Sequence, residues 1–135
     1  MAIRFETQQA ETKQKVLEFI EEWNAPSQEI LVKTSGSTGR PKEIRLLKKH
    51  MIASAKATGD FLKLTKGQSA LLCLSMDTIG GRMMVVRALV LDLELIVTDV
   101  SSTPLIGINE EIEFAAMVPM QIQKSLIESP DQVTK

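Results

Sequence analysis

The segment Thr34-Ser-Gly-Ser-Thr-Gly-Arg-Pro-Lys42 constrains this chain more than any other, because it combines hydroxyls, glycines and a lysine between two strand-like runs. The apolar run 30–32 precedes it and the alternating run 43–46 follows it, so both flanks predict strands. Glycines allow positive φ angles and let backbone N–H groups face an anion. The segment predicts a phosphate-binding loop, with these candidate contacts: Thr34, Ser35, Gly36, Ser37, Thr38, Gly39 and Lys42.

The spacing excludes two common nucleotide loops. A Walker A loop needs a hydroxyl residue directly after its lysine, but Glu43 follows Lys42 here. The dinucleotide fingerprint Gly-x-Gly-x-x-Gly is not present in the segment either. A plain flexible Ser/Thr/Gly linker is disfavoured, because it would need neither the terminal Pro-Lys pair nor strand signals on both sides. Because a strand and not a helix is expected after the loop, anion binding would depend on N–H groups, hydroxyls and Lys42.

Composition bounds the remaining possibilities. With 135 residues, of which 44% are hydrophobic, residues 1–135 are expected to form a single domain. A net charge of −1 disfavours a nucleic-acid partner, and the sequence has no apolar segment long enough to span a bilayer. Together with the polar N-terminal residues, this predicts a cytoplasmic protein. Cys73 lies in an apolar run and is expected to be a buried, inert thiol.

Hydrophobic periodicity predicts strands alternating with helices. Helices are expected at 8–23, 48–63, 79–91 and from Pro119 onward, and strands at 30–33, 43–46, 69–75, 93–98 and 113–118. This order indicates an α/β fold, with a layered, largely parallel sheet flanked by helices. The last helix is expected to turn Ile122 and Leu126 inward. The helix 79–91 is apolar almost all round, so it is expected to expose apolar surface that self-association would cover.

The Thr34–Lys42 segment resembles the phosphate loop of the AMP-forming, adenylate-forming superfamily of acyl-CoA and aryl-CoA synthetases. Two positions depart from that signature, because Lys33 replaces a frequent aromatic residue and Glu43 replaces the usual glycine. Two later blocks are also similar to the superfamily: 74–81, in which Thr78 stands where the family often has histidine, and 114–123. The resemblance covers roughly residues 28–128. Within the superfamily, the sequence looks most like the o-succinylbenzoate-CoA ligases of menaquinone synthesis.

The resemblance implies specific roles and ligands. The loop residues would contact the β- and γ-phosphates of ATP, and Thr34 would shape the loop entry. The residues near the acyl or CoA side would be Asp77, Thr78, Gly80, Gly81 and Arg82. A plain alternative for Asp77 and Arg82 is a solvated charge pair at a helix start. The implied substrates are ATP with Mg²⁺, an aromatic or acyl carboxylate, and CoA.

The resemblance also implies that groups needed for catalysis lie outside residues 1–135. Family enzymes carry a Mg²⁺-binding glutamate motif, a ribose-binding aspartate and a catalytic lysine, and none of these has a counterpart after Val118. The chain is therefore expected to be the N-terminal part of an AMP-binding large domain. Two alternatives remain open: a free-standing nucleotide- or anion-binding module without catalysis, and a structural or partner-binding domain with a vestigial loop.

Overall fold

A computed structural model describes residues 1–35, 39–128 and 130–133 of the chain. The fold is built on a four-stranded sheet in which every neighbouring pair is parallel, in the order β1-β5-β4-β6. A separate antiparallel hairpin is formed by β2 (Glu29–Ser35) and β3 (Pro41–Leu47). The strands of the sheet are β1 (Ala2–Phe5), β4 (Ser69–Leu72), β5 (Glu94–Val97) and β6 (Phe114–Ala115).

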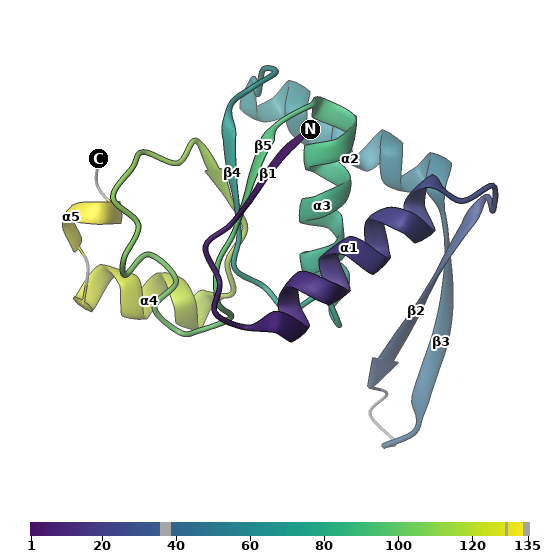
Figure 1. Cartoon of the computed structure of the whole chain (residues 1–135), viewed down its shortest axis with the longest axis horizontal. Helices are drawn as coiled ribbons and strands as arrows, with labels where there is room; N and C mark the ends of the chain where they lie inside the picture. The colour runs from purple at the N-terminus through teal and green to yellow at the C-terminus, as the bar shows by residue number, and fades with distance from the viewer. Residues whose placement is uncertain (36–38, 129, 134–135) are drawn as a thin grey trace.

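Helices lie on both faces of the parallel sheet. Figure 1 shows one group of helices on one side of the sheet and a second group on the opposite side. The first group is α1 (Ala10–Asn24), α2 (Lys48–Leu62) and α3 (Ile79–Leu91), and the second is α4 (Pro119–Glu128) and α5 (Pro130–Val133). The predicted α/β fold with a largely parallel, helix-flanked sheet is confirmed, as are the predicted positions of the first four helices within two residues.

Two hydrophobic clusters cover the two faces of the sheet. The larger lies under α1, α2 and α3 and includes Ala70, Leu72, Leu95 and Val97 from the strands. The smaller contains Leu71, Cys73 and Ile96, with residues of the 98–118 segment packed against it. Alternation along β4 and β5 sends successive side chains to opposite faces, and all four residues of β4 are buried. This confirms the prediction of a strand covered on both sides, although β4 ends at Leu72 rather than at residue 75.

Helix α3 corrects one expectation. Its apolar residues are buried inside this chain, since α3 packs against α2, α1, β4 and β5. It therefore leaves no broad apolar face for self-association to cover. The helix has so little polar surface because it lies between the sheet and α2, where both sides of the helix meet other elements.

Helix α4 corrects a second expectation. Its buried residues are Gln121 and Ser125, whereas Ile122 and Leu126 are 45% and 47% exposed. The hydrogen bonds of the Gln121 amide explain why this face of α4 is buried. Its Oε1 accepts from the backbone N–H of Val118 at 3.1 Å, and its Nε2 donates to the carbonyls of Cys73 at 3.0 Å and Ser101 at 2.9 Å. A buried amide with all these bonds made satisfies main-chain groups that an isoleucine would leave unpaired.

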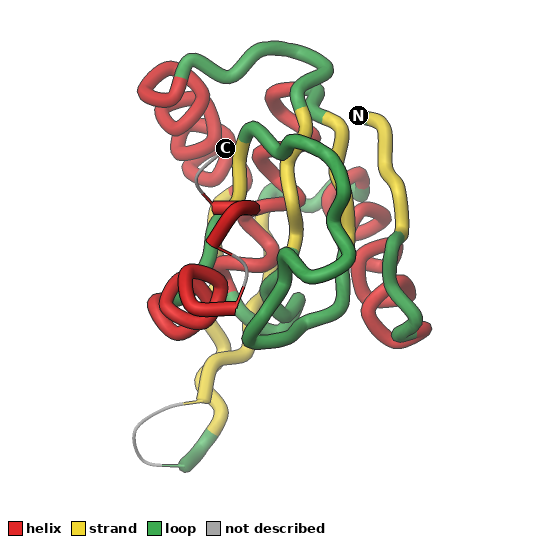
Figure 2. The backbone as a smooth tube through the Cα atoms, turned by 90° about the vertical axis from the view of Figure 1, so that its left-hand side faces the viewer, coloured by secondary structure: helices red, strands yellow, loops and turns green. Residues whose placement is uncertain are grey.

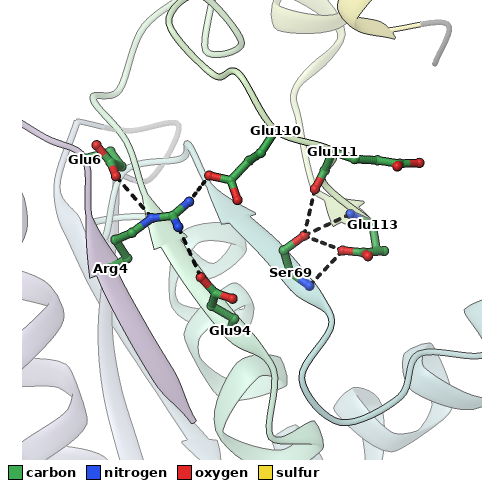
Figure 3. A network of polar contacts seen from close by, with 7 residues as sticks. All are labelled: Arg4, Glu6, Ser69, Glu94, Glu110, Glu111 and Glu113. Atoms are coloured by element: carbon green, nitrogen blue, oxygen red, sulfur yellow. Dashed lines mark hydrogen bonds and ion pairs between the residues drawn. The ribbon is translucent and has the colours of Figure 1, made fainter.

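Polar contacts from β1, β4 and β5 hold the 98–113 segment against the sheet (Figure 3). Arg4 of β1 forms ion pairs with Glu94 of β5 at 3.4 Å and with Glu110 of the segment. Nearby, the backbone N–H of Ser69 donates to the Glu113 carboxylate at 2.8 Å, and the Ser69 hydroxyl donates to the same group. These bonds lower the pKa of Glu113.

Candidate functional site

The predicted phosphate loop connects the two strands of the hairpin. Thr34 pairs with Lys42 and Ser35 pairs with Pro41 in the antiparallel register, so the chain returns as a strand as predicted. Gly36, Ser37 and Thr38 lie outside the described residues, as do the side chains of Thr34 and Ser35. Gly39 has φ +76°, and a Cβ built there meets no heavy atom within 4 Å. Its positive φ and its open surroundings suit a backbone that faces a ligand.

The hairpin extends away from the parallel sheet (Figures 1 and 2), yet its base belongs to the core. Ile30 and Val32 are fully buried in the larger cluster. The alternate residue Leu31 is 41% exposed, so packing holds one face of β2 only. In the described residues of the loop region, Lys33, Arg40 and Lys42 are exposed cations and Glu43 is the carboxylate. The excess of positive charge favours an anionic ligand.

The turn between β4 and α3 carries the residues that were predicted on the acyl or CoA side. The Thr78 side chain caps α3 by accepting from the backbone N–H of Gly81 at 3.1 Å, and its hydroxyl donates to the Ser75 carbonyl at 2.7 Å. Gly81 is required sterically, because a Cβ there would lie 2.1 Å from the Ser75 oxygen. At Gly80 the nearest atom to a built Cβ is Cδ1 of Leu74, at 3.2 Å. Thr78 and Gly81 thus shape the turn.

Asp77 and Arg82 do not form the charge pair considered as the plain alternative. The Asp77 carboxylate accepts from Lys15 of α1 at 3.0 and 3.1 Å. Hydrogen bonds from Lys15 to Glu11 and Asp77 raise the pKa of the Lys15 ammonium. Arg82 instead donates to two main-chain carbonyls, those of Met76 and Leu31. Asp77 and Arg82, with Lys15, Phe19 and other residues of α1 and the turn, line a hollow of about 210 Å³.

The β4–α3 turn lies at the carboxyl end of the sheet, beside the start of α4. Strands β4 and β6 are neighbours, but α3 after β4 and α4 after β6 cover opposite faces (Figure 1). In open α/β sheets such a reversal marks the crevice where ligands bind. Gln121 ties the start of α4 to this turn and to the segment after β5, through its bonds to the carbonyls of Cys73 and Ser101. Sequence analysis missed Gln121, because its two carbonyl partners are distant in sequence and a buried glutamine has no periodic signal.

Other reactive side chains add little to the site. Cys73 is fully buried, and burial raises the pKa of its thiol to about 11. The prediction of a buried, inert thiol is confirmed, because only the thiolate is a strong nucleophile. Within residues 1–35, 39–128 and 130–133, no group of three or more His, Cys, Asp or Glu side chains could hold a metal ion. Over the same ranges, no helix is long and apolar enough to cross a membrane.

Comparison with known proteins gives matches among solved structures. Neither protein-family models nor curated proteins match the chain. An AMP-forming acyl-CoA synthetase/AMP-acid ligase II-like protein from Dyadobacter fermentans DSM 18053 is 39% identical over 93% of this chain, with a TM-score of 0.83. o-Succinylbenzoate CoA synthetase from Bacillus subtilis, solved with the acyl-adenylate intermediate, is 22% identical over 73% of this chain, with a TM-score of 0.64. The structure of that synthetase with ATP and magnesium ion is also 22% identical over 73% of this chain, with a TM-score of 0.65.

These neighbours are AMP-forming acyl-CoA synthetase or AMP-acid ligase proteins, and the chain has the fold of the N-terminal domain of adenylate-forming enzymes. The chain spans 36% of the length of the Dyadobacter protein and 27% and 22% of the two Bacillus structures. At 22% identity, the similarity to the Bacillus synthetase establishes only that the two proteins share a fold.

Proposed function

We propose that this chain forms the phosphate-holding part of an ATP-dependent, AMP-forming carboxylate–CoA ligase. The hairpin carries the support for this proposal: the glycine-rich segment lies between paired strands, with Gly39 at positive φ and Lys42 on the exposed start of β3. The 39% identity to an AMP-forming synthetase-like protein supports the same reaction class. The larger enzyme would comprise an AMP-binding large domain to which residues 1–135 contribute the N-terminal part.

The proposed reaction has two steps. A carboxylate attacks the α-phosphorus of ATP to give an acyl-adenylate and pyrophosphate, and the thiol of CoA then displaces AMP. In the first step the loop 34–42 would bind the β- and γ-phosphates and orient the pyrophosphate leaving group. Backbone N–H groups near Gly39 and the Lys42 ammonium suit this task, because both stabilise negative charge without transferring a proton.

The β4–α3 turn would lie on the acyl or CoA side of the same cleft. Its position at the carboxyl end of β4, where the helices after neighbouring strands β4 and β6 lie on opposite faces of the sheet, supports this part of the proposal. Asp77, Thr78, Gly80 and Gly81 would line that side, mainly through the backbone shape that Thr78 and Gly81 impose. o-Succinylbenzoate is the first acid to test, since a synthetase for it shares the fold. The proposal includes a role of the enzyme in menaquinone synthesis and a location in the cytoplasm.

Mg²⁺ accompanies ATP in one neighbouring structure, but the described residues of this chain include no cluster that could hold a metal ion. When bound by other groups of the enzyme, Mg²⁺ would neutralise phosphate charge. The part played by residues 1–135 is to hold and orient the phosphates.

Calorimetry with pyrophosphate and ATP tests the loop. Replacing Lys42 with Ala is expected to weaken binding by about 1 to 3 kcal/mol, the range for loss of a hydrogen bond to a charged group. Arg45→Ala is the matched control. Arg45 is an exposed cation on the same strand, but it points to Glu29, with 3.7 Å between the charged groups. Equal affinities of the wild-type protein and Lys42→Ala would refute the loop assignment, and equal losses in both variants would reduce it to general charge attraction.

A further inference from the structure

Arg82 lies where the hairpin, the β4–α3 turn and α1 meet. Its backbone belongs to the first turn of α3. Its Nε donates to the Met76 carbonyl at 2.9 Å, and its Nη1 donates to the Leu31 carbonyl of β2 at 3.2 Å. The guanidinium carbon lies 5.6 Å from the centre of the Phe19 ring of α1. One planar group therefore joins three parts of the molecule.

Arginine suits this position better than lysine does. The guanidinium group presents donors at fixed angles in one plane, so it can reach two carbonyls at once while its face stacks on an aromatic ring. Phe19 is only 3% exposed, so the ring offers a fixed surface. A lysine ammonium would keep the charge but would lose the planar pair of donors.

The Leu31 contact adds a bond to the main chain of a strand that packs only one of its faces into the core. Ile30 and Val32 turn into the core, whereas the Leu31 side chain points outward and is 41% exposed. The start of α3 is itself held rigidly, through the Thr78 cap and the close approach of Gly81 to Ser75. Arg82 therefore connects a fixed point on α3 to β2, which otherwise pairs with β3 and packs the side chains of one face into the core.

We propose that Arg82 is a positioning residue, which sets the place of the β2–β3 hairpin relative to the β4–α3 turn and does not itself bind the anion. This inference rests on the proposed function, in which the hairpin holds the phosphates and the turn lies on the acyl side. The attacking carboxylate must come within about 3.5 Å of the phosphorus, so the relative placement of these two parts matters for the reaction. This positioning role replaces the expectation that Arg82 contacts the substrate.

Amide hydrogen exchange of the full chain tests the positioning role. Arg82→Gln is expected to raise the exchange rates of the β2 amides around Leu31 about tenfold, since losing one hydrogen bond costs near 1.4 kcal/mol. Exchange in β4 and β5 should stay unchanged. Arg82→Lys is expected to behave like Arg82→Gln, because it keeps charge without the planar pair of donors. Unchanged β2 exchange in Arg82→Gln, or full protection in Arg82→Lys, would overturn the inference.

Arg87 supplies the matched control. It lies on the same helix, is half-buried and has its guanidinium carbon 5.8 Å from the Phe114 ring, but its described hydrogen bond is to Met84. Arg87→Gln is expected to leave β2 exchange unchanged. If Arg87→Gln loosens β2 as much as Arg82→Gln does, or if Arg82→Gln loosens β4 and β5 equally, the effect is a general loss of stability and the inference fails.

A pyrophosphate titration separates positioning from direct binding. The Nε–H resonance of Arg82 is expected to stay in place while the amides of Gly39 and Lys42 shift. An Nε–H shift as large as theirs would identify Arg82 as an anion ligand and overturn the inference. If no amide responds to pyrophosphate, the proposed function fails, whereas the exchange experiment still decides whether Arg82 holds the hairpin.

Discussion

At the scale of single residues, Gly81 shows how closely the β4–α3 turn is packed. The Ser75 oxygen that a Cβ at position 81 would meet accepts from both the N–H of Thr78, at 3.1 Å, and its hydroxyl, at 2.7 Å. It is a main-chain atom held in two hydrogen bonds, so it cannot move aside without breaking the cap of α3. At the preceding residue, Gly80, the nearest atom to a built Cβ is the flexible end of the Leu74 side chain.

Replacing Gly81 with Ala should therefore lower the free energy of unfolding by about 1 to 3 kcal/mol, the usual cost of overpacking. The matched change Gly80→Ala should be nearly neutral, because alanine favours the helix and the Leu74 side chain can shift. Urea denaturation of the two variants measures the difference. Equal stabilities would mean that the turn is less tightly packed than the structure shows.

At the scale of helices and strands, the sequence predicts what local pattern determines. The hairpin, α1, α2, α3 and the start of α4 are confirmed because periodicity, turn residues and Pro119 fix them locally. Strand β1 was missed, since Ala2–Phe5 is stabilised by pairing with β5, whose partner residues lie 92 positions further along the chain. The inner face of α4 was assigned wrongly, because Gln121 bonds to Cys73 and Ser101 and these contacts have no local pattern.

The same distinction applies to the candidate site. The motif indicates a loop between two strands, and the structure confirms the hairpin around it. The contacts of Arg82 with Leu31, and of Asp77 with Lys15, connect segments that only the fold brings together. The residue types at 77 and 82 alone could not distinguish a charge pair from these separate roles.

The link between β4 and the segment before β6 should respond to acid. The Ser69 hydroxyl and N–H lower the pKa of Glu113, so the pair stabilises the fold above the unfolded glutamate pKa of about 4.3 and the stabilisation is lost as pH falls through the lower folded pKa. Because Glu113 is exposed, we expect Glu113→Gln to cost less than about 1 kcal/mol at neutral pH. This cost should shrink as pH falls through the lowered folded pKa of Glu113.

Urea denaturation at pH 7, 5 and 3 measures this dependence. Glu111→Gln is the control, since Glu111 joins the network through its main-chain oxygen. A cost for Glu113→Gln that stays constant across the pH range would show that the carboxylate charge does not contribute to this link.

At the scale of the whole molecule, the chain joins the β2–β3 hairpin, which we propose holds phosphate, to a four-stranded parallel sheet. It spans 36% of the length of its 39% identical neighbour. Adenylation places negative charge on the α-phosphate in the transition state, and groups must offset that charge. Among the residues that the structure describes, no cluster could hold a metal ion there. The central claim is that residues 1–135 hold the leaving pyrophosphate, whereas the groups that stabilise the reacting centre lie outside them.

Exchange of labelled pyrophosphate into ATP, driven by a carboxylate, tests this claim most directly. The assay would contain the chain, ATP, Mg²⁺ and o-succinylbenzoate, with the Bacillus subtilis o-succinylbenzoate CoA synthetase as the positive control. We predict that the chain binds pyrophosphate but gives no exchange above background, whereas the control does. Carboxylate-dependent exchange by the chain alone, abolished in Lys42→Ala, would contradict the account, because residues 1–135 would then contain the reacting centre itself.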